Sequence, residues 1–127
     1  MIRLLTLAVL ALVAIAAAAC SPAAAAPGSP VTADPDALQI SARDIRFSTS
    51  TLTAPADEAF QIVFDNQEAA PHNVSIYKDE GLSQAVFVKE PFGGPRSEVY
   101  EVPALAAGSY TFVCDVHKEM RGVLTVE

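Results

Sequence analysis

The alternation of apolar and polar residues is the feature that most constrains how this chain can fold. From about residue 37 onward, apolar side chains recur at every second position in short runs, at residues 38–42, 60–65, 74–77, 100–102, 110–112 and 124–126. This period of two is that of a β-strand with one buried face, and it differs from the 3.6-residue period of an amphipathic helix. Residues 82–88 fit either a short helical turn or a strand. Short strands separated by turn residues predict an all-β sandwich or barrel.

The first 19 residues have the composition of a secretory signal. Arg3 is followed by 16 uncharged and mostly apolar residues, 4–19. A positive charge ahead of an apolar run is typical of a cleaved signal peptide. The run is shorter than the roughly 20 residues that a membrane-spanning helix needs. We therefore predict export from the cytoplasm, with residues 1–19 as the signal peptide.

A cysteine, Cys20, directly follows Ala17, Ala18 and Ala19 at the end of this run. The junction resembles the lipobox of bacterial lipoproteins, in which the cysteine becomes the first mature residue and carries lipid, although Ala17 stands where leucine is usual. The alternative is an ordinary signal followed by an incidental cysteine. Residues 20–36 contain four prolines among alanines, which predicts an extended linker. We thus expect a lipidated Cys20 and linker at 20–36, a folded domain at 37–127, and a membrane-anchored protein in the periplasm or at the cell surface.

The exported part of the chain is strongly acidic. The sequence has 8 Lys and Arg against 15 Asp and Glu, so loss of Arg3 leaves seven basic residues and a net charge of −8. This charge disfavours nucleic acid and anionic lipid as partners and permits a partner with a basic docking face. A lipid on Cys20 would block a disulfide with Cys114. Cys114 is then a lone thiol in an oxidising compartment, where it needs a chemical role.

The residues best suited to bind a metal are few and clustered. Beyond Cys20 and the initiator methionine, the sequence has one cysteine, one methionine and two histidines, namely Cys114, Met120, His117 and His72. Three of these form a Cys-x2-His-x2-Met motif between two predicted strands. Two imidazoles, a thiolate and a weakly bound thioether form a known electron-transfer site for copper, because sulfur ligands suit Cu(I) and imidazoles suit Cu(II). Strand phase points Cys114 and His72 inward, so we predict one copper ion held by all four residues.

The segment Pro71-His72-Asn73-Val74, with the Cys-x2-His-x2-Met motif, resembles the cupredoxin family of blue-copper proteins. The short ligand loop is most similar to the amicyanin type. The resemblance covers roughly residues 37–127 and implies a Greek-key β-sandwich of about seven to eight strands. It also implies that copper is the cofactor and that the protein is an electron carrier.

The same resemblance implies a role for each residue of the site. The equivalents of His72, Cys114 and His117 bind copper strongly in the family, and the equivalent of Met120 binds it weakly. Asn73 would tie the two ligand-bearing segments together. The exposed edge of His117 would be the point through which electrons pass.

Two positions depart from the family pattern. Asp115 follows the cysteine, where serine or threonine is common, and Val116 precedes the loop histidine, where proline is common. Asp115 can still accept a hydrogen bond from Asn73, and we expect these two residues to surround the ligands. A negative charge at Asp115 would lower the reduction potential of a metal close to it.

Together these features predict a type 1 (blue) copper protein that is not an enzyme and passes single electrons between redox proteins outside the cytoplasm. A monomer is expected. The alternative is a lipoprotein that captures or delivers copper, although delivery sites tend to be richer in methionine and histidine. Zinc suits the thioether poorly, a Cys–His nucleophile would have only Asp115 to orient it, and two histidines are too few for a multicopper oxidase. A β-sandwich adhesion domain would leave the four ligands unexplained.

Overall fold

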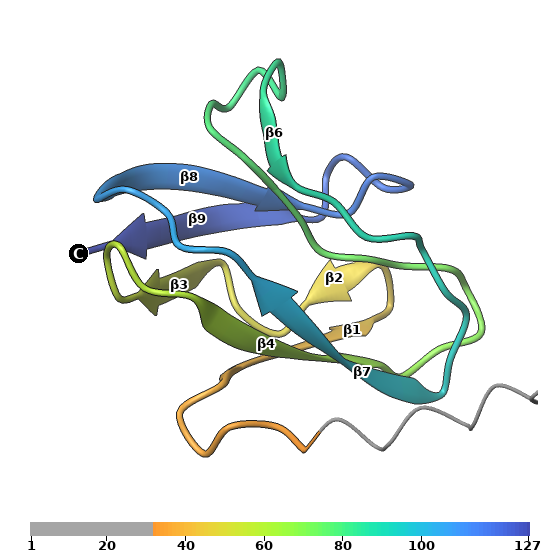
Figure 1. The fold of residues 1–127 in the computed structure, drawn as a ribbon. Helices are drawn as coiled ribbons and strands as arrows, with labels where there is room; N and C mark the ends of the chain where they lie inside the picture. The colour runs from red at the N-terminus through yellow and green to blue at the C-terminus, as the bar shows by residue number, and fades with distance from the viewer. Residues whose placement is uncertain (1–31) are drawn as a thin grey trace, which may run out of the picture.

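Residues 32–127, which the computed structural model describes, form two β-sheets packed as layers (Figure 1). The strands are β1 (Leu38–Arg43), β2 (Arg46–Phe47), β3 (Thr51–Ala54), β4 (Phe60–Asn66), β5 (Ser75–Tyr77), β6 (Ala85–Phe87), β7 (Arg96–Val102), β8 (Gly108–Val113) and β9 (Arg121–Val126). One sheet has the order β2-β1-β4-β7 and the other β3-β9-β8-β5-β6. Among these residues no helix is long and apolar enough to span a membrane.

The predicted all-β sandwich is confirmed, but the described residues contain nine strands rather than seven or eight. The difference comes from β2 and β3, which have two and four residues and lie outside the runs of clear alternation. The ambiguous segment 82–88 contains strand β6. The predicted signal peptide and Cys20 lie outside the described residues.

Aromatic side chains from several strands fill the space between the sheets. Every second residue of β4 is buried, as its alternation predicts. The ring of Phe64 lies 6.3 Å from that of Phe47, 5.5 Å from Phe92 and 5.8 Å from Tyr100, measured between centroids. Burial of one such side chain stabilises the fold by about 1.5–3 kcal/mol.

Pairing of β5 with β8 positions the predicted ligands. The strands are antiparallel with Ser75 opposite Val113, so the residues before β5 lie beside those after β8. Just before β5, His72 exchanges two backbone hydrogen bonds with Phe92, of 3.1 and 3.0 Å. Asn66, at the end of β4, donates a 2.7 Å hydrogen bond to the Phe92 carbonyl. The segment carrying His72 is therefore held from both sheets.

Tyr100 offers a test of this core. Its side chain is fully buried, and its hydroxyl has no hydrogen-bond partner among residues 32–127. An unpaired buried hydroxyl costs about 1–3 kcal/mol, so Tyr100→Phe should raise the free energy of unfolding by about 1 kcal/mol in urea denaturation. Tyr110 is the matched control, because its hydroxyl donates to the Ala106 carbonyl at 2.8 Å. Tyr110→Phe should lower the free energy of unfolding by about 1 kcal/mol. An equal loss of stability in Tyr100→Phe would contradict the inference that the Tyr100 hydroxyl is unpaired.

Candidate metal centre

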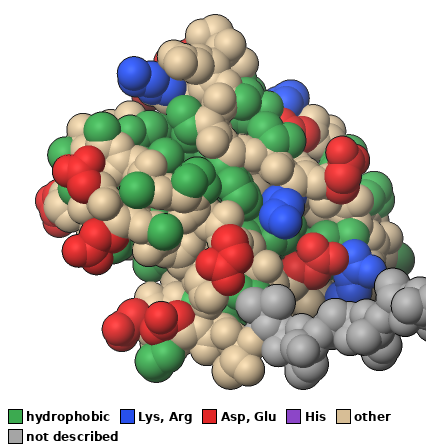
Figure 2. Space-filling view, in the orientation of Figure 1, with side chains coloured by type: hydrophobic (Ala, Val, Ile, Leu, Met, Phe, Trp, Pro, Cys, Tyr) green, Lys and Arg blue, Asp and Glu red, His purple; other side chains and the backbone are tan. Residues whose placement is uncertain are grey.

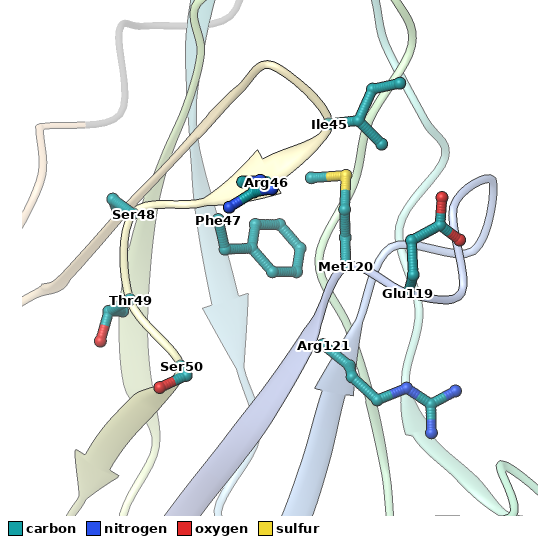
Figure 3. Close-up of a pocket in the computed structure, with 9 residues that line it drawn as sticks. All are labelled: Ile45, Arg46, Phe47, Ser48, Thr49, Ser50, Glu119, Met120 and Arg121. Carbon is teal, nitrogen blue, oxygen red and sulfur yellow. The ribbon is translucent and has the colours of Figure 1, made fainter.

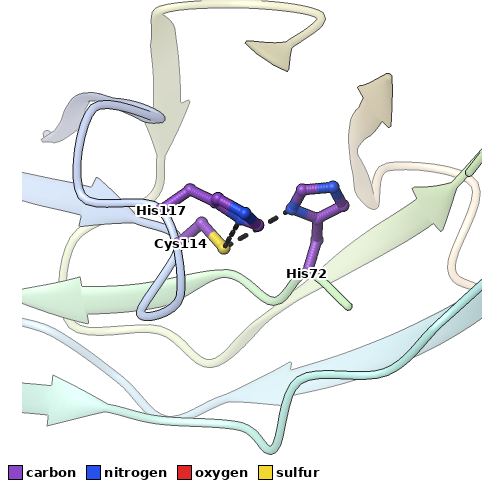
Figure 4. A group of neighbouring side chains, drawn as sticks. All are labelled: His72, Cys114 and His117. Atoms are coloured by element: carbon purple, nitrogen blue, oxygen red, sulfur yellow. Dashed lines mark hydrogen bonds between the residues drawn. The ribbon is translucent and has the colours of Figure 1, made fainter. Parts of the chain in front are cut away.

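Three of the predicted ligands, from two distant parts of the chain, meet at one end of the sandwich (Figure 4). The ligand atoms of His72, Cys114 and His117 lie within 4.8 Å of one another. The Cys114 Sγ is 3.7 Å from Nδ1 of His72 and 3.8 Å from Nδ1 of His117. The structure thus brings one sulfur and two ring nitrogens together, with both nitrogens facing the sulfur.

The loop between β8 and β9 carries all three residues of the Cys-x2-His-x2-Met motif. The Cys114 amide donates to the Met120 carbonyl, and the Met120 amide donates to the His117 carbonyl, both at 2.9 Å. These two bonds fix the spacing of the three residues along the loop. The Met120 side chain is buried and lines a pocket of about 510 Å³ near Phe47 and Ile45 (Figure 3). The fourth predicted ligand is therefore held in the same loop by its backbone.

The four candidate ligands differ in their exposure to solvent. The side chains of His72 and Cys114 are fully buried, and Met120 is 3% exposed. His117 is half-buried, and its neighbour Val116 is exposed. Only one candidate ligand therefore reaches the protein surface.

Glu68 fixes the orientation of His72, and the sequence analysis did not identify it. The Glu68 Oε1 lies 2.6 Å from Nε2 of His72. The same carboxylate accepts the amides of Ile45 and Asp44 at 3.1 and 3.2 Å. A proton on Nε2, shared with Glu68, leaves Nδ1 free to bind a metal. Glu68 lies in an irregular segment between predicted strands, so no periodicity marks it.

The charge of Glu68 follows from the same contacts. The backbone hydrogen bond from Ile45, with a smaller contribution from His72, holds the pKa of Glu68 below its ordinary value. Glu68 is therefore ionised at neutral pH. An ionised acceptor at this position favours the ring tautomer of His72 that a metal requires.

Asn73 and Asp115, the two residues expected around the ligands, bind each other. The Asp115 amide donates to Asn73 Oδ1 at 2.8 Å, and the Asn73 side-chain amide donates to the Asp115 carboxylate at 2.8 Å. The hydroxyls of Ser75 and Tyr77 donate to the same carboxylate. Sequence analysis missed these two, although they are polar residues in phase with Asn73. Burial alone would raise the pKa of Asp115, but hydrogen bonds from Ser75, Asn73, Tyr77 and Lys118 bring it below its ordinary value.

Comparison with known proteins identifies the family. A family model described as the cupredoxin-like domain matches residues 7–126. The chain belongs to the cupredoxin-like family. Amicyanin-alpha of Methylorubrum extorquens is 28% identical over 92 residues, which cover 70% of this chain and 71% of that protein. The family resemblance noted in the sequence is thus confirmed.

Solved structures agree with this assignment. A Cu(I) form of an amicyanin variant is 28% identical, with a TM-score of 0.57 over 76% of this cupredoxin and 87% of that chain. A reduced auracyanin from Roseiflexus castenholzii is 22% identical and shares the fold, with a TM-score of 0.63 over 72% of this chain and 96% of that one. The fold and the amicyanin-like sequence therefore agree.

Removal of Glu68 should weaken metal binding. In Glu68→Ala the His72 ring loses the acceptor that fixes its tautomer, so we expect the affinity for Co(II), a coloured probe ion, to fall by about 10–100-fold. The affinity is measured by competition with a chelator. Glu58→Ala is the matched control, because Glu58 is exposed in the turn between β3 and β4. Equal affinities in the two variants would show that Glu68 does not orient the ligand.

Proposed function

We propose that this cupredoxin is a type 1 (blue) copper protein that carries single electrons outside the cytoplasm. The observation that carries the proposal is the convergence of one thiol sulfur and two imidazole nitrogens within 4.8 Å. His72 and Cys114 are 42 positions apart in the sequence. When bound, copper supplies a Cu(II)/Cu(I) couple, and a mixed set of nitrogen and sulfur ligands suits both oxidation states.

The spacing of the three atoms fits a single metal ion. A first-row ion bonded at about 2.0 Å to nitrogen and about 2.3 Å to sulfur, with an angle near 120°, separates those two atoms by about 3.7 Å. The two observed nitrogen–sulfur distances are 3.7 and 3.8 Å. The side chains therefore need little movement to receive the ion.

The donor set favours copper over zinc. Zinc sites in proteins are built from thiolate, imidazole and carboxylate ligands, with water in open sites. The fourth candidate here, Met120, offers a thioether, which is the weak axial ligand of blue-copper sites. The Cu(I) form of the related amicyanin supports the same choice.

Surrounding contacts would keep the ligands in place when the oxidation state changes. Glu68 orients His72, and the pair Asn73–Asp115 joins the two ligand-bearing segments. Electron transfer is favoured when few atoms move. A buried site of this kind would also exchange its ion slowly, which supports an electron carrier over a protein that captures or delivers copper.

His117 is the proposed point of electron entry and exit. His117 is half-buried, whereas the other three candidate ligands are buried, and the exposed Val116 lies beside it in the loop. Acidic side chains are spread over the face drawn in Figure 2, with fewer basic ones between them. The acidic net charge of the exported chain supports a redox protein with a basic docking face as the partner, because complementary charge accelerates encounter.

We also propose that the protein is exported and anchored as a monomer in the periplasm or at the cell surface. Residues 1–19 would be the signal peptide, Cys20 would carry lipid, and 20–36 would link it to the domain at 37–127. The entry point of the chain supports this arrangement. Leu38 pairs with Ile62 near the start of β4, whereas the ligand segment is held at the end of β4. A tether would thus enter at the end of the sandwich opposite the metal centre.

Anchoring through Cys20 is tested in cells that make the full chain. Cys20→Ser should abolish incorporation of labelled fatty acid into the protein, because a hydroxyl in place of the thiol does not receive the lipid. Ser21→Ala is the control and should still be labelled. Labelling of Cys20→Ser equal to that of the unmodified protein would rule out lipid on Cys20.

The copper assignment is tested by visible absorption. The purified Cu(II) protein should absorb intensely through a thiolate-to-copper transition, and Cys114→Ser should abolish that absorption, because an alcohol cannot replace the thiolate. Retention of the colour in this variant would show that Cys114 is not a ligand.

The role as a carrier is tested by comparing two rates in the copper-loaded protein. Electron self-exchange, measured by nuclear magnetic resonance line broadening in mixtures of both oxidation states, should be fast. Transfer of copper to an apo acceptor should be slow over the same period. Rapid loss of copper with slow self-exchange would instead establish capture or delivery as the function.

A further inference from the structure

One carboxylate beside the ligand loop receives hydrogen bonds from three alternate residues of a single strand face. Asn73 donates to Asp115 at 2.8 Å and Tyr77 donates at 2.7 Å, while the Ser75 hydroxyl donates to the same carboxylate. Positions 73, 75 and 77 share one face because side chains alternate along a strand. The carboxylate thus faces a row of donors supplied by β5 and the residue two positions before it.

The hydrogen bonds to Asp115 are largely shielded from solvent. Asn73 and Ser75 are fully buried, and the Asp115 side chain is only 23% exposed. A buried polar group that loses its partner is costly, so this arrangement resists rearrangement. Among residues 32–127, Lys118 is the one charged group bound to the carboxylate, at 3.2 Å, and it is half exposed to solvent. The neutral donors therefore hold Asp115 from the protein side, and Lys118 approaches from the solvent side.

We propose that Asn73, Ser75 and Tyr77 hold Asp115 as a fixed negative charge one residue after the candidate ligand Cys114, and that this charge favours Cu(II) over Cu(I). The inference rests on the proposed copper-binding function. Reduction adds one electron to the site, and a fixed negative charge one residue from Cys114 opposes that addition. In the partly shielded interior such a charge acts more strongly than in water. The three donors are positioning residues, since they act on the metal through Asp115.

The proposal predicts that changes to the acid and to its donors shift the copper equilibrium in the same direction by different amounts. Asp115→Asn removes the charge while keeping the shape and one acceptor, so the equilibrium should shift toward Cu(I), by about tenfold. The double variant Ser75→Ala/Tyr77→Phe keeps the charge but removes two donors that hold it in place. Because the freed carboxylate can turn toward solvent, where its charge is screened, the equilibrium should also shift toward Cu(I), by less than in Asp115→Asn. A purely structural role would destabilise the apo protein without changing the Cu(I)/Cu(II) ratio beyond that of the control.

The experiment equilibrates each copper-loaded variant with a fixed ratio of ferricyanide to ferrocyanide and reads the Cu(II) fraction from its visible absorption. Asp79→Asn is the matched control. Its carboxylate also accepts a serine hydroxyl, from Ser83 at 2.8 Å, but it lies in the turn between β5 and β6. This control should change the Cu(I)/Cu(II) ratio by less than twofold. Thermal unfolding of the apo forms reports any loss of structure separately.

Two results would overturn the inference. One is an Asp115→Asn ratio equal to that of Asp79→Asn, and the other is a double variant whose ratio equals that of Asp79→Asn or shifts toward Cu(II). If Asp115→Asn does not fold, the double variant decides the matter. Absence of thiolate-to-copper absorption in the unmodified protein would instead refute the proposed function itself.

Discussion

The antiparallel register of β5 and β8 is the constraint on which the metal centre depends. With Ser75 opposite Val113, the histidine before one strand and the cysteine after the other lie at the same end of the sandwich. A slip of one residue would turn every side chain of a strand to the opposite face and separate these ligands. The two hydrogen bonds between Asn73 and Asp115 lock this register, because breaking them would leave the buried side-chain amide of Asn73 without these partners.

Most of the buried polar residues lie around the candidate metal centre. Of the five buried polar residues among residues 32–127, four lie at the metal end, namely Asn66, His72, Asn73 and Ser75. Each has a hydrogen-bond partner, and those of Asn66, Asn73 and Ser75 come from another segment of the chain. A satisfied polar network of this kind makes one arrangement of the loops much more stable than its competitors. The apolar core supplies stability, and this network supplies the geometry of the ligands.

The exposure of the ligands links this geometry to function. A site buried on all sides would exchange neither electrons nor ions readily, and a fully open one would lose its ion. Among the four candidate ligands only His117 reaches the surface, while His72, Cys114 and Met120 are buried. The arrangement favours the proposed passage of an electron through one imidazole edge without release of the metal, and the acidic net charge of the chain favours a basic partner.

The sequence by itself determined the fold class, the inward faces of the longer strands and the identity of the candidate ligands. It could do so because alternation is a local property and because only four residues of the domain suit a soft metal site. Tertiary structure alone decided that Glu68 would orient His72, and that Ser75 and Tyr77 would bind Asp115. These contacts join residues that lie in irregular segments or about 40 positions apart, so they exist only once the two sheets have packed and their registers are fixed.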